Sequence, residues 1–370
     1  MNKKYLSIFL IALLFSSCGE NKNSKNDVYE NTIKGKKAEL KKIGQFVIQE
    51  DSTAFIGRFR NVKFREGKLV LADMLNPALF FIDINGNIVK KFKFEKGEGP
   101  GEVNEIGNFE IMNGRIYISD MGNLRWSVFD TTGRFIKSEK PFYDPRSKTQ
   151  GLYYENASIT ESYAGQIYVS IIEVKYIRDL QQNKSKSIAI LDSTLIIKKV
   201  FGFMDDIYSK LRIYISTATM TVDSKGFIYY SQKPTYSIYK YDSSGNFVKV
   251  FGVKGKFKVI NENLIANQPY SQIDRIAKKY STSSALFSSP KGYILHLFVD
   301  LTDKFFDTGS LPDRINYLKV YDTDGNYISS DIKLDGVLIT VDNEGKLYIY
   351  EHDEPGNRVI GIYELKVIKD

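Results

Sequence analysis

The chain has 370 residues and a formal net charge of +8, with 52 Lys and Arg residues against 44 Asp and Glu residues. Its single cysteine excludes an intramolecular disulfide, and its two histidines are too few for a His-rich zinc site. The basic residues are dispersed, without an arginine-rich helix or a base-stacking motif, so the charge does not indicate nucleic-acid binding.

Residues 1–17 have the layout of a secretory signal. A short basic start, Lys3 and Lys4, precedes an apolar core at residues 6–15, and small residues lead to Cys18. The apolar core is too short to span a bilayer. This segment resembles a bacterial lipoprotein signal, although Phe15 stands where leucine is usual. The resemblance implies lipid on Cys18 and an outer-membrane lipoprotein on the periplasmic or the surface side; an ordinary secretory signal is the alternative.

Residues 18–44 are rich in Asn, Lys and Glu and show almost no apolar periodicity. Such a segment cannot bury enough apolar surface to offset the entropy lost on ordering, so we expect a flexible tether that holds the domain off a membrane. Residues 45–370 have uniform composition without a linker that would mark a boundary, and we expect one domain there.

Two patterns recur six times along this domain. A strand that begins with glycine starts at Gly67, Gly114, Gly165, Gly226, Gly292 and Gly345. Apolar residues followed by an acidic residue, usually with a glycine turn, end at Asp83, Asp130, Asp192, Asp242, Asp322 and Glu364. Six units of short strands and tight turns predict an all-β fold, a six-bladed β-propeller of four-stranded antiparallel blades.

Residues 114–137 resemble an NHL repeat, with Asp120, Asn123, Arg125, Phe129, Asp130 and Gly133 at the positions of its pattern. Residues 97–102, between the first two units, read GEGPGE, a sequence common in NHL-like and TolB-like six-bladed propeller lipoproteins of the Bacteroidetes. This resemblance supports the fold and does not indicate a ligand. Because residues 97–102 lack phosphate-loop spacing and no helix follows, we interpret them as a turn between blades.

The last unit supplies only three strands, and an open ring would expose a sheet edge. We therefore expect residues 45–49 to form the fourth strand of the last blade and close the ring. The longest insertion, residues 252–289, predicts an amphipathic helix around residues 270–280. This insertion is interpreted as a lid on a blade edge or, alternatively, as a contact for a partner.

In a propeller the loops after each innermost hairpin and the loops between blades open on one face, which is the usual place for a ligand. The polar residues expected there are Asp73, Asn76, Asp120, Asn123, Arg125, Lys233, Tyr236, Glu351, His352 and Arg358. The alternative for the Asp and Asn side chains is that they hydrogen-bond their own turns. His296 alternates with leucines and is expected to be a structural residue within a strand.

The sequence has no nucleophile elbow and no free thiol, so it does not support hydrolysis by a nucleophilic side chain. We therefore expect an envelope-anchored binding module for a glycan, peptide or protein partner, with no cofactor. The alternative is a calcium-dependent lactonase-like hydrolase or lyase. Resemblance to six-bladed lactonases implies a metal in the channel, and Asp73, Asp120, Asn123 and Glu351 offer the ligand types. A third hypothesis is a scaffold role in an envelope complex.

Overall fold

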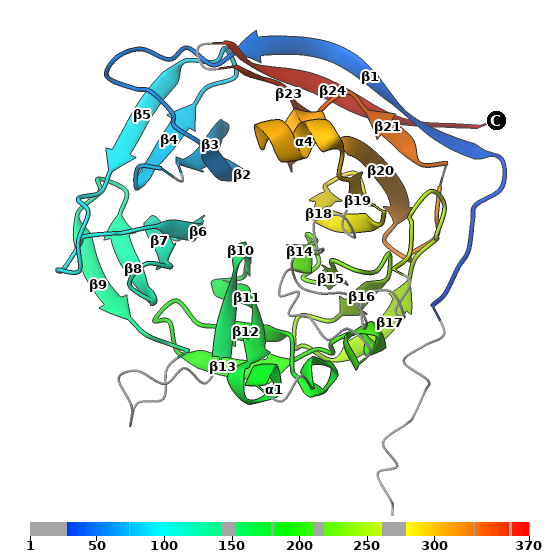
Figure 1. Cartoon of the computed structure of the whole chain (residues 1–370), viewed down its shortest axis with the longest axis horizontal. Coiled ribbons are helices and arrows are strands. Elements are labelled where there is room, and N and C mark those ends of the chain that lie inside the picture. The colour runs from blue at the N-terminus through cyan, green and yellow to red at the C-terminus, as the bar shows by residue number, and fades with distance from the viewer. Residues whose placement is uncertain are drawn as a thin grey trace, which may run out of the picture.

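Six four-stranded antiparallel sheets surround a central axis as the blades of a β-propeller (Figure 1). The computed structural model describes residues 28–73, 75–142, 153–178, 181–209, 218–260, 279–328, 330–354 and 357–369. Each of the first five blades uses four consecutive strands, with the first strand innermost and the fourth at the rim. The predicted fold and blade number are confirmed.

The strand bounds follow the six units of the sequence. Blade one contains β2 (Phe59–Arg65), β3 (Lys68–Asp73), β4 (Ala78–Ile82) and β5 (Ile88–Lys93). Blade two contains β6 (Ile106–Met112), β7 (Arg115–Asp120), β8 (Arg125–Asp130) and β9 (Phe135–Glu139). Blade three contains β10 (Tyr153–Tyr163), β11 (Gln166–Glu173), β12 (Ile188–Leu191) and β13 (Ile197–Phe201).

Blade four contains β14 (Ala218–Val222), β15 (Ile228–Gln232), β16 (Ile238–Tyr241) and β17 (Phe247–Phe251). Blade five contains β18 (Ser281–Ser289), β19 (Tyr293–Asp300), β20 (Ile315–Asp322) and β21 (Ile332–Leu334). Short helices lie in the connections: α1 (Val174–Arg178), η1 (Gln182–Lys184), η2 (Asp206–Ser209), α4 (Asp303–Thr308) and η4 (Leu311–Asp313). Among the described residues, no helix has the length and apolar character needed to cross a membrane.

The sixth blade joins the two ends of the chain. It contains β22 (Val337–Val341), β23 (Lys346–Glu354) and β24 (Asn357–Lys369), and β1 (Lys36–Val47) pairs with β24 as its outermost strand. In Figure 1 the blue β1 runs along the red β24 at the rim. Closure of the ring by an N-terminal strand is thus confirmed.

The closing strand is longer than expected, because it begins at Lys36 instead of residue 45. Residues before it also lie on the rim: the Tyr29 amide donates to Val250 O at 3.2 Å, and the Ile33 amide donates to Tyr327 O at 2.8 Å. Residues 28–44 therefore belong to the propeller and not to the tether. Charged residues around Ala38 and Leu40 concealed this strand, whose buried side packs on blades five and six.

The expected helix around residues 270–280 falls almost wholly outside the described residues, as do residues 261–278 of the insertion that contains it. Residues 18–27 of the expected tether also lie outside them. The described parts of the insertion are residues 252–260 and 279–289. The last nine of these form β18, the innermost strand of blade five, so the insertion is shorter than expected. Residues 252–260 leave the end of β17 and include the buried Phe257, whose ring lies 5.4 Å from that of Phe298.

Each outer turn is built around an aspartate that ends the third strand. In blade one, Asp83 Oδ1 accepts the amides of Asn85 and Asn87, both at 2.9 Å. Asp130, Asp192, Asp242 and Asp322 accept the equivalent amides in the next four blades. This local bonding explains why the aspartate recurs in the sequence.

A lysine in each of four outer strands fastens the next blade. Its ammonium group donates to a backbone carbonyl in the outer turn of that blade: Lys90 to Thr131 at 2.7 Å, Lys137 to Thr194 at 2.7 Å, Lys199 to Ser244 at 2.5 Å, and Lys249 to Asp324. Lysines on outer strands also keep these exposed edges from pairing with other chains. Part of the positive charge that looked dispersed in the sequence is therefore organised along the rim.

The glycine of an outer turn packs on a phenylalanine of the preceding blade. A Cβ atom on Gly245, whose φ is +77°, would lie 2.7 Å from the Phe201 ring. Gly133 and Gly325 lie against Phe92 and Phe251 in the same way. Blade three differs, since the buried Leu195 occupies the turn at φ +69° and Glu139 takes the place of the phenylalanine. The Leu195 side chain belongs to the same apolar cluster as Trp126 and Val128 of the preceding blade.

We predict that Gly245→Ala lowers the free energy of unfolding by about 2–4 kcal/mol, because alanine adds left-handed strain and a steric clash with Phe201. Gly67→Ala is the matched control, with φ +73° and no atom within 4 Å of the new Cβ; it should cost only about 1–2 kcal/mol from strain. Urea unfolding of both variants measures the difference. Equal losses would contradict the inter-blade contact.

Candidate functional site

The connections of the blades divide between two faces. Because adjacent strands are antiparallel, the loops after the second strand of each blade and the loops between blades share one face. They include residues 94–105, 121–124, 181–187 and 301–314, and we call this the loop face. The short turns, such as residues 66–67 and 84–86, form the opposite turn face. All of the helices in the described part of the chain lie in connections of the loop face.

Asp73 and Asp120 occupy equivalent positions at the start of loop-face turns. Asp73 accepts the amides of Gly57 and Arg58 at 3.0 Å and of Leu75 at 2.9 Å, and Asn76 donates to it at 3.2 Å. The carboxylate therefore ties its own turn to the chain that enters the blade. This matches the alternative interpretation of these residues, in which they stabilise turns.

Blade two repeats the arrangement. Asp120 accepts the amides of Asn104 and Glu105 at 3.2 Å, and Asn123 donates its side-chain amide to Asp120 at 2.6 Å and to Gly97 O at 2.8 Å. Arg125 spans residues 97–102, donating to the carbonyls of Glu98, Gly99 and Glu102 at 2.8, 2.9 and 2.8 Å. The GEGPGE segment is therefore a turn clamped by Arg125, as expected from its spacing.

Arg358 has the same role in blade six. Its guanidinium contacts both carboxylate oxygens of Glu50 at 2.5 Å and donates to Gly57 O at 3.1 Å. Both charged groups are buried, and Glu50 also accepts the Ile56 amide at 2.7 Å. This ion pair joins positions 308 residues apart, where the last blade meets the first.

The remaining predicted residues have different surroundings. Glu351 accepts from Lys42 at 2.7 Å and from the Tyr363 hydroxyl at 2.5 Å, so it faces β1. Tyr236 donates to Glu30 at 3.2 Å, and the Lys233 carbonyl accepts the Ser283 amide at 2.9 Å. His352 lies in β23 in register with Val359.

The four proposed calcium ligands are thus engaged with separate partners. Asp73, Asp120 and Asn123 hold backbone groups of their own blades, and Glu351 pairs with Lys42. In the described part of the chain, no group of three or more His, Cys, Asp or Glu side chains could hold a metal ion.

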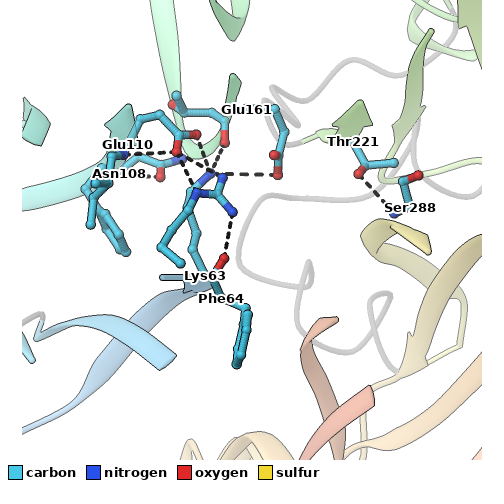
Figure 2. Close-up of polar contacts among 11 residues, drawn as sticks. Lys63, Phe64, Asn108, Glu110, Glu161, Thr221 and Ser288 are labelled. Atoms are coloured by element: carbon cyan, nitrogen blue, oxygen red, sulfur yellow. Dashed lines mark hydrogen bonds and ion pairs between the residues drawn. The ribbon is translucent and has the colours of Figure 1, made fainter. Parts of the chain in front are cut away.

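A cluster that sequence reasoning missed lies on the innermost strands of blades one to three. Lys63 from β2, Glu110 from β6 and Glu161 from β10 point toward one another across the central channel (Figure 2). Lys63 Nζ is 3.0 Å from Glu110 Oε2 and 3.8 Å from Glu161 Oε1, and it also donates to Thr160 O. With Arg65, these three residues form what we call the channel cluster.

Arg65 completes the channel cluster from the end of β2. Its guanidinium donates to Glu110 Oε1 through Nη2 at 3.0 Å and Nε at 3.3 Å, and to Phe64 O through Nη1 at 2.9 Å. Glu110 is fully buried, whereas the side chains of Arg65 and Glu161 are 31% and 29% exposed. Solvent therefore reaches one base and one acid of the cluster.

The two acids of the channel cluster have opposite electrostatic environments. Burial favours the neutral form of Glu110, but Lys63 and Arg65 outweigh it and lower the pKa of this carboxyl. Burial raises the pKa of Glu161 against the attraction of Lys63, and the neighbouring Glu110 raises it further. Glu110 is therefore a paired carboxylate, while Glu161 takes up a proton more readily than an exposed glutamate.

Polar side chains also satisfy the inner edges of the blades, where backbone groups lack a partner strand. Glu110 accepts the Ile111 amide at 3.0 Å and Asn108 accepts the Phe109 amide at 2.7 Å. Across the channel in Figure 2, Thr221 Oγ1 accepts the Ser288 amide at 3.1 Å. Part of the polar lining of the channel therefore stabilises the strands themselves.

A signal for the channel cluster exists in the sequence. Lys63, Glu110 and Glu161 each stand four residues before the glycine that opens the second strand, namely Gly67, Gly114 and Gly165. Aligning the units on that glycine would have placed three charged side chains at one position of three successive innermost strands. His296 is buried as expected, with Nε2 2.8 Å from Ser283 Oγ, and burial lowers its pKa to about 3.

We predict that Glu110→Gln lowers the free energy of unfolding by about 3–5 kcal/mol at pH 7, because Lys63 would stay buried without its anionic partner. Since the pKa of Glu110 is lowered in the folded state, this contribution is lost as the pH falls through that pKa. Denaturant unfolding at pH 7 and in acid measures both effects.

Two variants serve as controls for that loss. Glu161→Gln should leave stability at pH 7 unchanged or raise it, because the folded state favours the neutral form of Glu161. Glu139→Gln removes an exposed partner of Lys137 and should change stability by less than about 1 kcal/mol. A loss for Glu110→Gln no larger than for Glu139→Gln would contradict the role of the buried carboxylate.

No family model matches the chain, and no curated protein matches it in sequence. Among solved structures, a DUF4221 family member from Bacteroides vulgatus is similar, with TM-score 0.66 and 14% identity over 90% of this chain and 99% of that one. A candidate exported protein from Bacteroides fragilis has TM-score 0.60 and 13% identity over 89% and 95%. A streptogramin B lyase aligns more loosely, at TM-score 0.44 and 13% identity over 89% and 98%. At these identities the likeness is one of fold.

Proposed function

We propose that the protein is an envelope-anchored binding module that takes a protein or peptide partner on its loop face. The secretory layout of residues 1–17, followed by Cys18 as in a lipoprotein signal, supports placement in the cell envelope. The fold it shares with a candidate exported protein accords with that placement.

The observation that carries the proposal is an exposed apolar surface on the loop face. Phe55, Leu75 and Leu124 are 49%, 60% and 49% exposed on loops of neighbouring blades. Phe55 and Leu75 lie at one corner of the loop face, beside Gly57. A Cβ on Gly57 would lie 3.0 Å from Leu75. The Phe55 ring centre is 5.9 Å from the Arg358 guanidinium, which donates to Gly57 O. Exposed apolar groups that lie together commonly mark interaction sites.

The polar contacts around this surface favour a protein or peptide over a glycan. Four charged side chains of the loop face hydrogen-bond backbone groups or Glu50, namely Asp73, Asp120, Arg125 and Arg358. These four side chains are therefore already engaged, and the exposed Phe55 and Leu75 offer apolar contacts, whereas hydroxyl-rich glycans need polar groups. The same contacts hold the loops in place before binding, which reduces the entropy lost when a partner docks.

We predict that the double change Phe55→Ser and Leu75→Ser weakens capture of the partner at least about tenfold, because apolar anchors dominate binding energy. The measurement is quantitative crosslinking and pull-down of the lipid-anchored protein from its own envelope. Cys18→Ala controls for membrane placement, and Ile84→Ser, an exposed apolar residue in an outer turn of the turn face, is the matched surface control.

Undiminished capture by the double variant, or equal loss with Ile84→Ser, would contradict this site. A glycan as the captured species would contradict the choice of partner class. Charge reversal at Asp120 or Arg125 is unsuitable as a test, because both side chains hold the backbone of residues 97–105 in place.

A further inference from the structure

We propose that the turn-face end of the central channel binds a small oxyanion, a carboxylate or a phosphate, between Arg65 and Glu161. This site is separate from the loop face and does not depend on the proposed function. Arg65 is the last residue of β2, immediately before the turn at residues 66–67, so the site lies near the turn-face mouth of the channel.

Arg65 supplies the donors. A guanidinium carries five N–H groups, and three of those of Arg65 are used by Glu110 and the Phe64 carbonyl. Within the described residues, one N–H on each terminal nitrogen has no partner, and this pair can bind carboxylate or phosphate with two parallel hydrogen bonds. The contacts with Glu110 hold the guanidinium plane, so little side-chain freedom is lost when an anion binds.

Glu161 supplies a further hydrogen-bond donor for the anion when its carboxyl is protonated. Its carboxyl is 3.8 Å from Lys63 Nζ, beyond hydrogen-bond distance, and its side chain is partly exposed. The charged groups that act on it are Lys63 and Arg65 from β2 and Glu110 from β6. In its protonated form this carboxyl can donate a hydrogen bond to an oxyanion held by Arg65.

Charge balance couples binding to protonation. With Glu161 ionised, the two bases and two acids of the channel cluster cancel, and an incoming anion meets no net attraction. With Glu161 protonated, Lys63, Arg65 and Glu110 leave one positive charge for the anion to neutralise. The burial that raises the pKa of Glu161 favours this state. Binding therefore takes up one proton and weakens as the pH rises, by up to about tenfold per pH unit.

The test is a titration of the purified protein with acetate, monitored through the NMR signal of acetate at pH values between about 6 and 8.5. The charge of acetate is constant above about pH 6. The native protein should bind acetate, and the affinity should fall with rising pH. Inorganic phosphate, added at one pH, should compete with acetate.

Glu161→Gln keeps a neutral hydrogen-bond donor and should bind acetate with an affinity independent of pH. Arg65→Gln should weaken binding at least about tenfold, since it removes the charged pair of donors. Arg134→Gln is the matched control, because Arg134 is exposed and pairs with Asp130 in an outer turn; it should leave binding unchanged. Melting temperatures verify that each variant is folded.

Three outcomes would overturn the inference. They are absence of acetate binding to the native protein, unchanged binding in a folded Arg65→Gln variant, and retained pH dependence in Glu161→Gln. The last variant keeps the buried Lys63–Glu110 pair and is therefore expected to fold even if Arg65→Gln does not.

Discussion

Closure of the ring is the constraint on which the other parts of this molecule depend. Each blade packs only on its neighbours, so an open seam would leave blade faces and strand edges without partners. Three contacts close it: β1 pairs with β24, Glu50 pairs with Arg358, and the Gln49 amide donates to Gly86 O in blade one at 2.8 Å. The N-terminal segment thus contacts blade six and blade one, and the fold needs no disulfide.

Closure and inter-blade fastening also determine which side chains remain for function. Arg358, Asp73 and Glu351 hold the seam or its adjoining turns, although residue type alone suggests ligand binding. The loop face offers exposed apolar side chains, those of Phe55, Leu75 and Leu124, on clamped loops. The channel offers a different chemistry, because the innermost strands bring charged residues from three blades to one place.

The sequence was sufficient for features that depend on local signals. Glycine turns and alternating apolar residues predicted six blades, because a strand and its turn are encoded by adjacent residues. Charged residues on both sides of Ala38 hid the start of β1, whose pairing partner lies more than 300 residues away. Whether Asp73 or Arg125 would bind a ligand or the backbone depends on loops brought together by folding. The channel cluster was accessible in principle, because its members share one position relative to the glycines of successive units.

The most direct test of ring closure compares thermal unfolding of two shortened chains. One lacks residues 1–35 and keeps all of β1, and the other lacks residues 1–48 and so loses the whole strand. Our account predicts one cooperative transition near that of the native protein for the first. For the second it predicts a melting temperature lower by about 10 °C or more, as expected from a loss of a few kcal/mol in a domain of this size. Equal melting temperatures for the two chains would contradict closure by β1.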